Sequence, residues 1–112
     1  MKLLLDECMP SVLKNDFPGH VVLTVEDAGF KGLKNGKLLR AMAGSFDVLV
    51  TVDKSLPRQQ NLAKFGIAVL LFRTFSNRYN DLLPLLPQAL SALGSIQPGE
   101  VAIIRPPSFL TP

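Results

Sequence analysis

The sequence predicts an α/β fold in which helices cover both faces of a mostly parallel sheet. Apolar segments alternate along the chain with segments of helical pattern, as in strand–helix–strand units. Three of the apolar segments lack polar alternation, which is typical of strands buried on both faces. The 112 residues are 47% hydrophobic and 19% charged, enough for one core. We expect one three-layer α/β/α domain over residues 1–105 and an irregular, proline-containing tail over 106–112.

The expected strands are short runs of apolar and β-branched residues that end at turn-forming residues. They cover residues 2–5, 20–24, 46–52, 67–72 and 101–104. Helix-capping residues and helical spacing mark the segments between them. These cover residues 12–15, 36–43, 55–64 (a loop or short helix) and 80–93. Asn35 is expected to cap the second segment, and Pro87 predicts a distorted start of the last one.

The composition excludes several classes of protein. The longest apolar runs are too short to span a bilayer, and only three leucines precede Asp6 and Glu7, which does not fit a signal peptide. A single cysteine, Cys8, excludes an internal disulfide and fits a reducing compartment. We therefore expect a cytoplasmic protein without membrane contact. The net charge of +3 is compatible with a polyanionic partner but does not indicate one.

Two aspartates end the two clearest strands. Asp6 follows Leu3–Leu5, and Asp53 follows the run that ends at Val52. In an open parallel sheet, ligands bind beyond the carboxyl ends of the strands. If the two strands are neighbours, both carboxylates share that crevice, and paired carboxylates hold hard cations such as Mg²⁺. The alternative is that each aspartate only caps the turn or helix that follows it.

Short motifs in a fixed order resemble a known family. They are Leu4-Leu5-Asp6-Glu7, Gly32-Leu33-Lys34-Asn35-Gly36, Thr51-Val52-Asp53-Lys54, Gln59-Gln60-Asn61-Leu62 and Ser76-Asn77-Arg78. From residue 1 to about residue 100 the chain resembles the small PIN-like proteins, which are often found as toxin ribonucleases beside an antitoxin partner. The resemblance implies an α/β/α fold, an acidic site dependent on Mg²⁺ or Mn²⁺, RNA as substrate and an antitoxin protein as partner.

The resemblance also implies roles for particular residues. Asp6 and Asp53 match the family's metal-binding acids. Glu7 is a further candidate catalytic acid from its position alone, because it directly follows Asp6. Asn77, after the fourth strand, matches a polar position that is often Asp or Asn.

One position departs from the family pattern. Related sequences usually place a glutamate directly after Asn-Gly, where this chain has Lys37. If Lys37 points into the crevice, its ammonium pairs with an aspartate and takes the cation's place. If it points out, Glu7 or Glu26 is left to supply the missing oxygen, and Glu26 is the weaker candidate because it also reads as a solvated acid at a helix start.

Basic residues form a second candidate group. They are Lys31, Lys34, Lys37 and Arg40, spaced every three residues, together with Lys54 and Arg58. A cation cluster binds RNA phosphates without regard to sequence. We expect Lys34, Lys37, Lys54 and Arg58, with Asn35 and Asn77, to contact the substrate. The alternative is an ordinary solvated surface.

The sequence leaves three functions open. The first is a metal-dependent ribonuclease, which suits a chain whose single histidine, His20, is expected to be structural. The second is a PIN-like RNA- or protein-binding module that Lys37 has disabled. The third is a response-receiver domain with Asp53 as phosphoryl acceptor, although Arg73 follows the fourth strand where that class needs a lysine. Surplus leucines over 82–93, with Phe109-Leu110, predict a homodimer or antitoxin contact.

Overall fold

The computed structural model describes residues 1–107, without the side chains of Arg58 and Gln59. The strands are β1 (Lys2–Leu5), β2 (Val21–Thr24), β3 (Val48–Thr51), β4 (Ala68–Phe72) and β5 (Val101–Ile104). The helices are η1 (Ser11–Asp16), α1 (Asn35–Met42), α2 (Leu56–Gln59), α3 (Leu62–Phe65), α4 (Tyr79–Leu82), η2 (Leu83–Leu85) and α5 (Leu86–Leu93). All five expected strands are confirmed.

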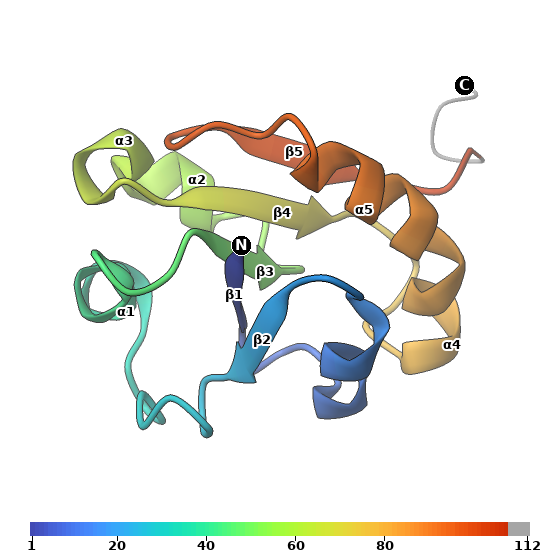
Figure 1. The fold of residues 1–112 in the computed structure, drawn as a ribbon, viewed down its shortest axis with the longest axis horizontal. Coiled ribbons are helices and arrows are strands. Elements are labelled where there is room, and N and C mark those ends of the chain that lie inside the picture. Colours follow the sequence, from blue (N-terminus) through green and yellow to red (C-terminus); the bar gives the residue numbers. More distant parts are fainter. Residues whose placement is uncertain (108–112) are drawn as a thin grey trace.

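The five strands form one sheet in the order β2-β1-β3-β4-β5, and every pair is parallel. The strands lie between α1, α2 and α3 on one side and η1, α4 and α5 on the other (Figure 1). The expected three-layer α/β/α class is therefore confirmed. The sheet grows outward from β1 in both directions, so the chain reverses its course between β1 and β3. In doubly wound sheets, a ligand site lies at this reversal.

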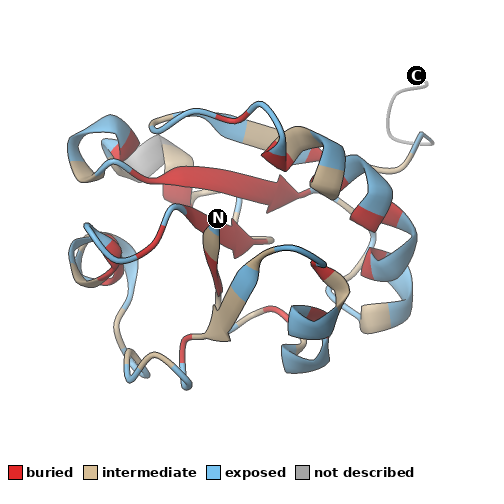
Figure 2. Cartoon of the chain, viewed as in Figure 1, coloured by how far each residue is buried: buried red, intermediate tan, exposed pale blue. Residues whose placement is uncertain are grey.

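The core has two parts because successive side chains of a strand point to opposite faces. Leu3, Leu5, Val48 and Val50 pack with η1, α4 and α5, whereas Leu4 and Leu49 pack with α1. β3 and β4 are buried along their whole length (Figure 2). Burial of each such side chain contributes roughly 1.5–3 kcal/mol. The central strands are thus a rigid base for whatever follows their carboxyl ends.

Two details of the helices differ from expectation. Asn35 is the first residue of α1 and not its cap; the cap position is Lys34, and Asn35 has φ 52°. Asparagine tolerates this left-handed conformation better than most residues, which explains its place in the turn. The segment expected over 80–93 is divided into α4, η2 and α5. Pro84 and Pro87, in η2 and α5, remove two helix donors and account for the division.

The leucine-rich segment is mostly core. Its buried members are Leu82, Leu85, Leu86 and Leu93. Of the leucines in this segment, Leu83 is the one that is exposed, at 39%. The segment therefore offers little exposed apolar surface for a protein contact. Phe109, Leu110 and most of the expected tail lie outside the described residues. None of the helices in the described part of the chain has the length and hydropathy that a membrane span requires.

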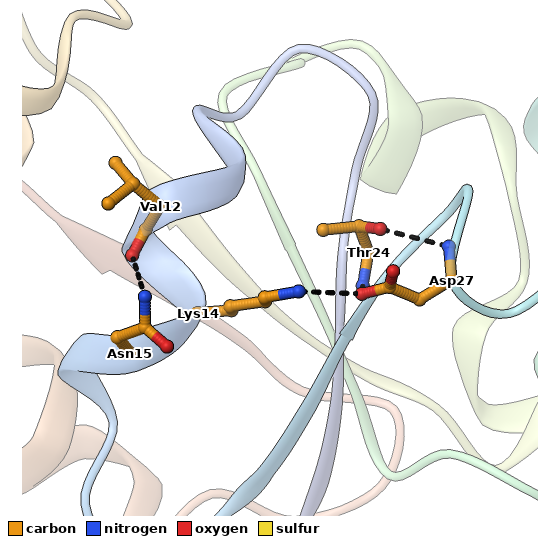
Figure 3. Close-up of polar contacts among 5 residues, drawn as sticks. All are labelled: Val12, Lys14, Asn15, Thr24 and Asp27. Atoms are coloured by element: carbon orange, nitrogen blue, oxygen red, sulfur yellow. Dashed lines mark hydrogen bonds and ion pairs between the residues drawn. The ribbon is translucent and has the colours of Figure 1, made fainter.

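A polar cluster attaches η1 to the turn after β2 (Figure 3). The Oδ2 of Asp27 accepts hydrogen bonds from Thr24 N (3.1 Å) and Lys14 Nζ (3.2 Å), and Thr24 Oγ1 accepts one from Asp27 N (3.0 Å). These bonds, the one from Thr24 N first, hold the pKa of Asp27 below its usual value. The cluster therefore fixes the turn that carries Glu26.

Candidate active site

A pocket of about 470 Å³ opens beyond the carboxyl ends of β1 and β3. It lies where the chain reverses its course across the sheet, as expected for a ligand site in this class of fold. Its polar lining residues are Asp6, Glu7, Cys8, Lys34, Asn35 and Asp53. Leu33, Leu38 and Leu56 belong to its apolar wall. The structure therefore brings the two strand-end aspartates, 47 positions apart in the sequence, into one pocket.

Thr51 joins the two aspartates. It is the last residue of β3 and is fully buried, and its Oγ1 donates a hydrogen bond to Asp6 Oδ2 (2.7 Å). The same Oγ1 accepts a hydrogen bond from Asp53 N (3.0 Å). One hydroxyl therefore fixes both acidic segments relative to each other. Sequence reasoning missed Thr51, although its signal was present: it is the polar residue that ends an apolar strand.

Both aspartates also make the local bonds of turn and cap residues. Asp6 Oδ1 accepts a hydrogen bond from Glu7 N (2.8 Å). Asp53 Oδ1 accepts bonds from Ser55 N (3.0 Å) and Ser55 Oγ (2.6 Å). Among the described residues, the hydrogen bonds to the Asp53 carboxylate all go to Oδ1. The structural role and a ligand-binding role are therefore compatible, because Oδ2 of Asp53 is not engaged by these bonds.

Cys8 completes the inner wall of the pocket. Its Sγ lies 3.6 Å from both Asp6 Oδ2 and Thr51 Oγ1. Burial raises the pKa of the Cys8 thiol above its ordinary value of 9.0, and the charge of Asp6 raises it further. Cys8 therefore stays protonated at neutral pH, donates to Asp6, and is poorly suited to act as a nucleophile.

The donor set fits a hard cation only in part. Asp6 and Asp53 offer carboxylate oxygens, which Mg²⁺ and Mn²⁺ accept while keeping several waters. Glu7 lines the same pocket, but its Oε1 accepts a hydrogen bond from Gly32 N (3.0 Å). Within the described residues, no three side chains of Asp, Glu, His or Cys are grouped closely enough to hold a metal. The two aspartates are thus the residues that would hold one.

The residues at the start of α1 divide into two sets. Lys34 and Asn35 line the pocket. Lys37 is exposed on α1 and does not line it, so its ammonium does not take a cation's place between the aspartates. Glu26 lines a neighbouring pocket of about 210 Å³ together with Asp6 and Glu7. Glu7 is therefore the acid that shares a pocket with both aspartates.

The other expected contact residues lie to one side. Asn77 donates from Nδ2 to the backbone oxygen of Cys8 (2.8 Å) and, with Lys54, lines a third pocket beyond β3 and β4. The side chain of Arg58 lies outside the described part of the chain. His20 directly precedes β2 and so lies at the amino ends of the strands, away from the pocket, where its Nδ1 is 3.3 Å from the Met1 amino group. That position agrees with a structural role.

Comparison of the chain with protein-family models, with curated proteins and with solved structures gave no match. The class of the molecule is therefore defined by its own geometry. It is a three-layer α/β/α domain with an acidic pocket at the reversal point of a parallel sheet.

Proposed function

We propose that this protein is a metal-dependent ribonuclease of the PIN-like class and the toxin of a toxin–antitoxin pair. The observation that supports the reaction is the meeting of Asp6 and Asp53 in one pocket, with Thr51 bonded to both segments. The order of short motifs that resembles PIN-like proteins supports the class and the toxin role. The single cysteine fits a reducing compartment and supports a cytoplasmic location.

The residues of the pocket have two different roles in the proposed reaction: some would bind the metal, and others orient the residues that bind it. A bound Mg²⁺ or Mn²⁺ would lower the pKa of its water and neutralise charge on the phosphate during in-line attack. Asp6 and Asp53 would hold the cation. Thr51 and Ser55 orient the two carboxylates through short hydrogen bonds, as outer groups around metal ligands usually do.

RNA is the substrate that the surroundings of the pocket favour. Lys34 lines the pocket beside the acids, and Lys31 and Lys54 line the two hollows that adjoin it. These cations contact phosphates without reading base sequence. Cys8 remains protonated and needs no part in the chemistry, because a bound metal would supply an activated water in place of a side-chain nucleophile.

A second candidate is a PIN-like module that binds RNA or protein without cleaving it. Two observations favour it. The described residues contain no group of three metal-binding side chains, and Glu7 is engaged by Gly32 N. In this case Lys37, in the place of the family's glutamate, has removed the oxygen that completes the metal site.

The strand order favours a third candidate. Receiver-type doubly wound domains have the same order, β2-β1-β3-β4-β5. Asp53, after the central strand β3, would then accept a phosphoryl group. Arg73, which follows β4, is a poor substitute for the lysine that this class uses. Incubation with a small phosphoryl donor such as acetyl phosphate tests this candidate: mass spectrometry that finds no modified Asp53 removes it.

The ribonuclease proposal is tested by cleavage of a labelled single-stranded RNA by protein freed of metal and then supplied with Mn²⁺. We expect cleavage only with the metal, and a loss of about 100-fold or more in Asp6→Asn and Asp53→Asn. Asp47→Asn is the matched control, because Asp47 directly precedes β3 and therefore lies at the amino end of that strand, away from the pocket at its carboxyl end. Cleavage that survives metal removal, or that persists in both aspartate variants, would overturn the proposal.

A further inference from the structure

A hollow of about 440 Å³ lies beyond the carboxyl ends of β3 and β4. Its walls come from the segment after β3 and from the loop that follows β4. Val52 lines both this hollow and the acidic pocket, so the two meet at that residue. A chain molecule that occupies the acidic pocket can therefore extend over the end of β3 into the hollow.

The hollow is positively charged. Lys54 and Arg73 line it, and no carboxylate does. Among the described residues the only ion pair is Lys14–Asp27, so neither cation has a carboxylate partner there. Two unpaired cations in a concave site attract an anion, and an arginine offers several donors to phosphate oxygens.

The walls of the hollow are held in place. At one end of the loop, Arg73 N donates to Ile104 O (2.7 Å), which attaches the loop to β5. At the other end, Asn77 Nδ2 donates to Cys8 O (2.8 Å), which attaches it to the segment after β1. Ser76 Oγ is bonded to the Asp81 carboxylate and to Arg78 N. The polar side chains of Ser76 and Asn77 thus hold the loop in shape. The cationic groups of Lys54 and Arg73 take no part in those bonds and can contact an anion.

The same loop presents an aromatic ring. Phe75 lies between two lining residues, Thr74 and Ser76, and is 74% exposed. Exposed aromatic rings beside cations are the stacking platforms of proteins that bind single-stranded nucleic acid. A base next to a phosphate bound in the hollow would stack on this ring.

We propose that the hollow binds a second phosphate of the single-stranded RNA whose scissile phosphate lies at the acidic pocket. Lys54 and Arg73 contact that phosphate, and Phe75 stacks on an adjacent base. The identity of the strand rests on the proposed ribonuclease function, whereas binding in the hollow requires no metal. The hollow thus gives the substrate its direction across the sheet.

The test measures how tightly a short fluorescent single-stranded RNA binds in the presence of EDTA. Fluorescence anisotropy gives the affinity at each of several salt concentrations. We expect Arg73→Gln and Lys54→Gln each to weaken binding roughly tenfold at low salt. Each should also reduce the slope of log affinity against log salt by about 0.7, the change for one lost phosphate contact on a single strand. Arg73→Lys should keep most of the slope because it keeps the charge.

Two further variants sharpen the test. Lys64→Gln removes an equal charge from α3, which precedes the amino end of β4, and should leave affinity unchanged. Phe75→Ala should weaken binding about tenfold without changing the salt slope, because stacking releases no counterions. If Arg73→Gln and Lys54→Gln behave like Lys64→Gln, the proposal is wrong. Arg73-dependent binding of inorganic phosphate, without any effect on RNA affinity, would overturn it as well.

The outcomes separate this proposal from the ribonuclease proposal. A protein that binds RNA through Lys54 and Arg73 but never cleaves it would remove the reaction and keep the subsite. A ribonuclease whose KM and salt slope are insensitive to both cations would remove the subsite and keep the reaction. Circular dichroism of each variant checks that the fold is intact.

Discussion

The buried hydroxyl of Thr51 donates a 2.7 Å hydrogen bond to the carboxylate of Asp6, from the end of β3 to the end of β1. The same oxygen accepts from Asp53 N, so one threonine fixes the distance between two acidic segments. Because both strands are buried and paired in parallel, this arrangement is a rigid part of the fold. The proposed metal site depends on it.

Replacement of Thr51 by valine tests that dependence. Valine has the same shape but no hydroxyl, so Asp6 loses a donor and Asp53 N loses its acceptor. We expect the free energy of unfolding to fall by about 1–3 kcal/mol and Mn²⁺ affinity to fall by roughly 10- to 100-fold. Urea denaturation and Mn²⁺ titration measure the two effects. Thr51→Ser should restore most of both, and a Thr51→Val protein that matches the wild type would refute the role of the hydroxyl.

The reactivity of Cys8 reports the electrostatics of the pocket. Burial first, and then the Asp6 charge, raise the pKa of this thiol above 9.0. We expect iodoacetamide to react with Cys8 more slowly at pH 8 than with glutathione, because less thiolate is present. Asp6→Asn removes a negative charge, lowers the Cys8 pKa and should speed the reaction severalfold. Reaction as fast as with a free thiol, at the same pH, would contradict this description of the pocket.

The cluster at the turn after β2 predicts a pH effect on stability. The pKa of Asp27 is lower in the folded protein than its ordinary value of 3.8. The stabilisation from the charged carboxylate is therefore present above the unfolded pKa and is lost as the pH falls through the folded one. We expect Asp27→Asn to lower the Tm at pH 7 by a small amount, and the difference from wild type to shrink below about pH 4. A difference that persists at pH 2 would show that charge is not its cause.

Lys37 separates an active ribonuclease from a disabled module. Lys37→Glu restores the acid that the family resemblance predicts, at an exposed position of α1 beside the pocket. We expect it to raise Mn²⁺ affinity by roughly 10- to 100-fold, and RNA cleavage with it, if the site is otherwise intact. Lys37→Gln is the control, because it removes the positive charge without adding an oxygen anion. If Lys37→Glu gives no more than Lys37→Gln, residue 37 is not part of the site.

The sequence was enough to predict where the strands lie and which of them are buried on both faces. Apolar runs without polar alternation marked the central strands. Because ligands bind beyond the carboxyl ends of parallel strands, the aspartates at those ends could be named as candidate site residues. Both inferences need only local pattern. The placement of Asp6 and Asp53 in one pocket also required β1 and β3 to be neighbours, which the sequence offered as an assumption and the sheet order confirms.

Other features depend on tertiary structure that local pattern does not contain. The direction of Lys37 follows from how α1 packs against the sheet, and the bond of Asn77 to Cys8 joins positions 69 residues apart. Asn35 was expected as a cap because its side chain suits that position, but its backbone conformation places it one residue later. Thr51 was overlooked because a threonine at the end of a strand is common; the sequence marks its polarity, and the hydrogen bonds to Asp6 and Asp53 then show its role.

The most direct measurement is the binding of Mn²⁺ to metal-free protein, followed by electron paramagnetic resonance of the free ion. We predict one Mn²⁺ per chain, with affinity reduced tenfold or more in both Asp6→Asn and Asp53→Asn and unchanged in Asp47→Asn. Wild-type protein that binds no Mn²⁺, or that binds it equally well without either strand-end carboxylate, would contradict the account.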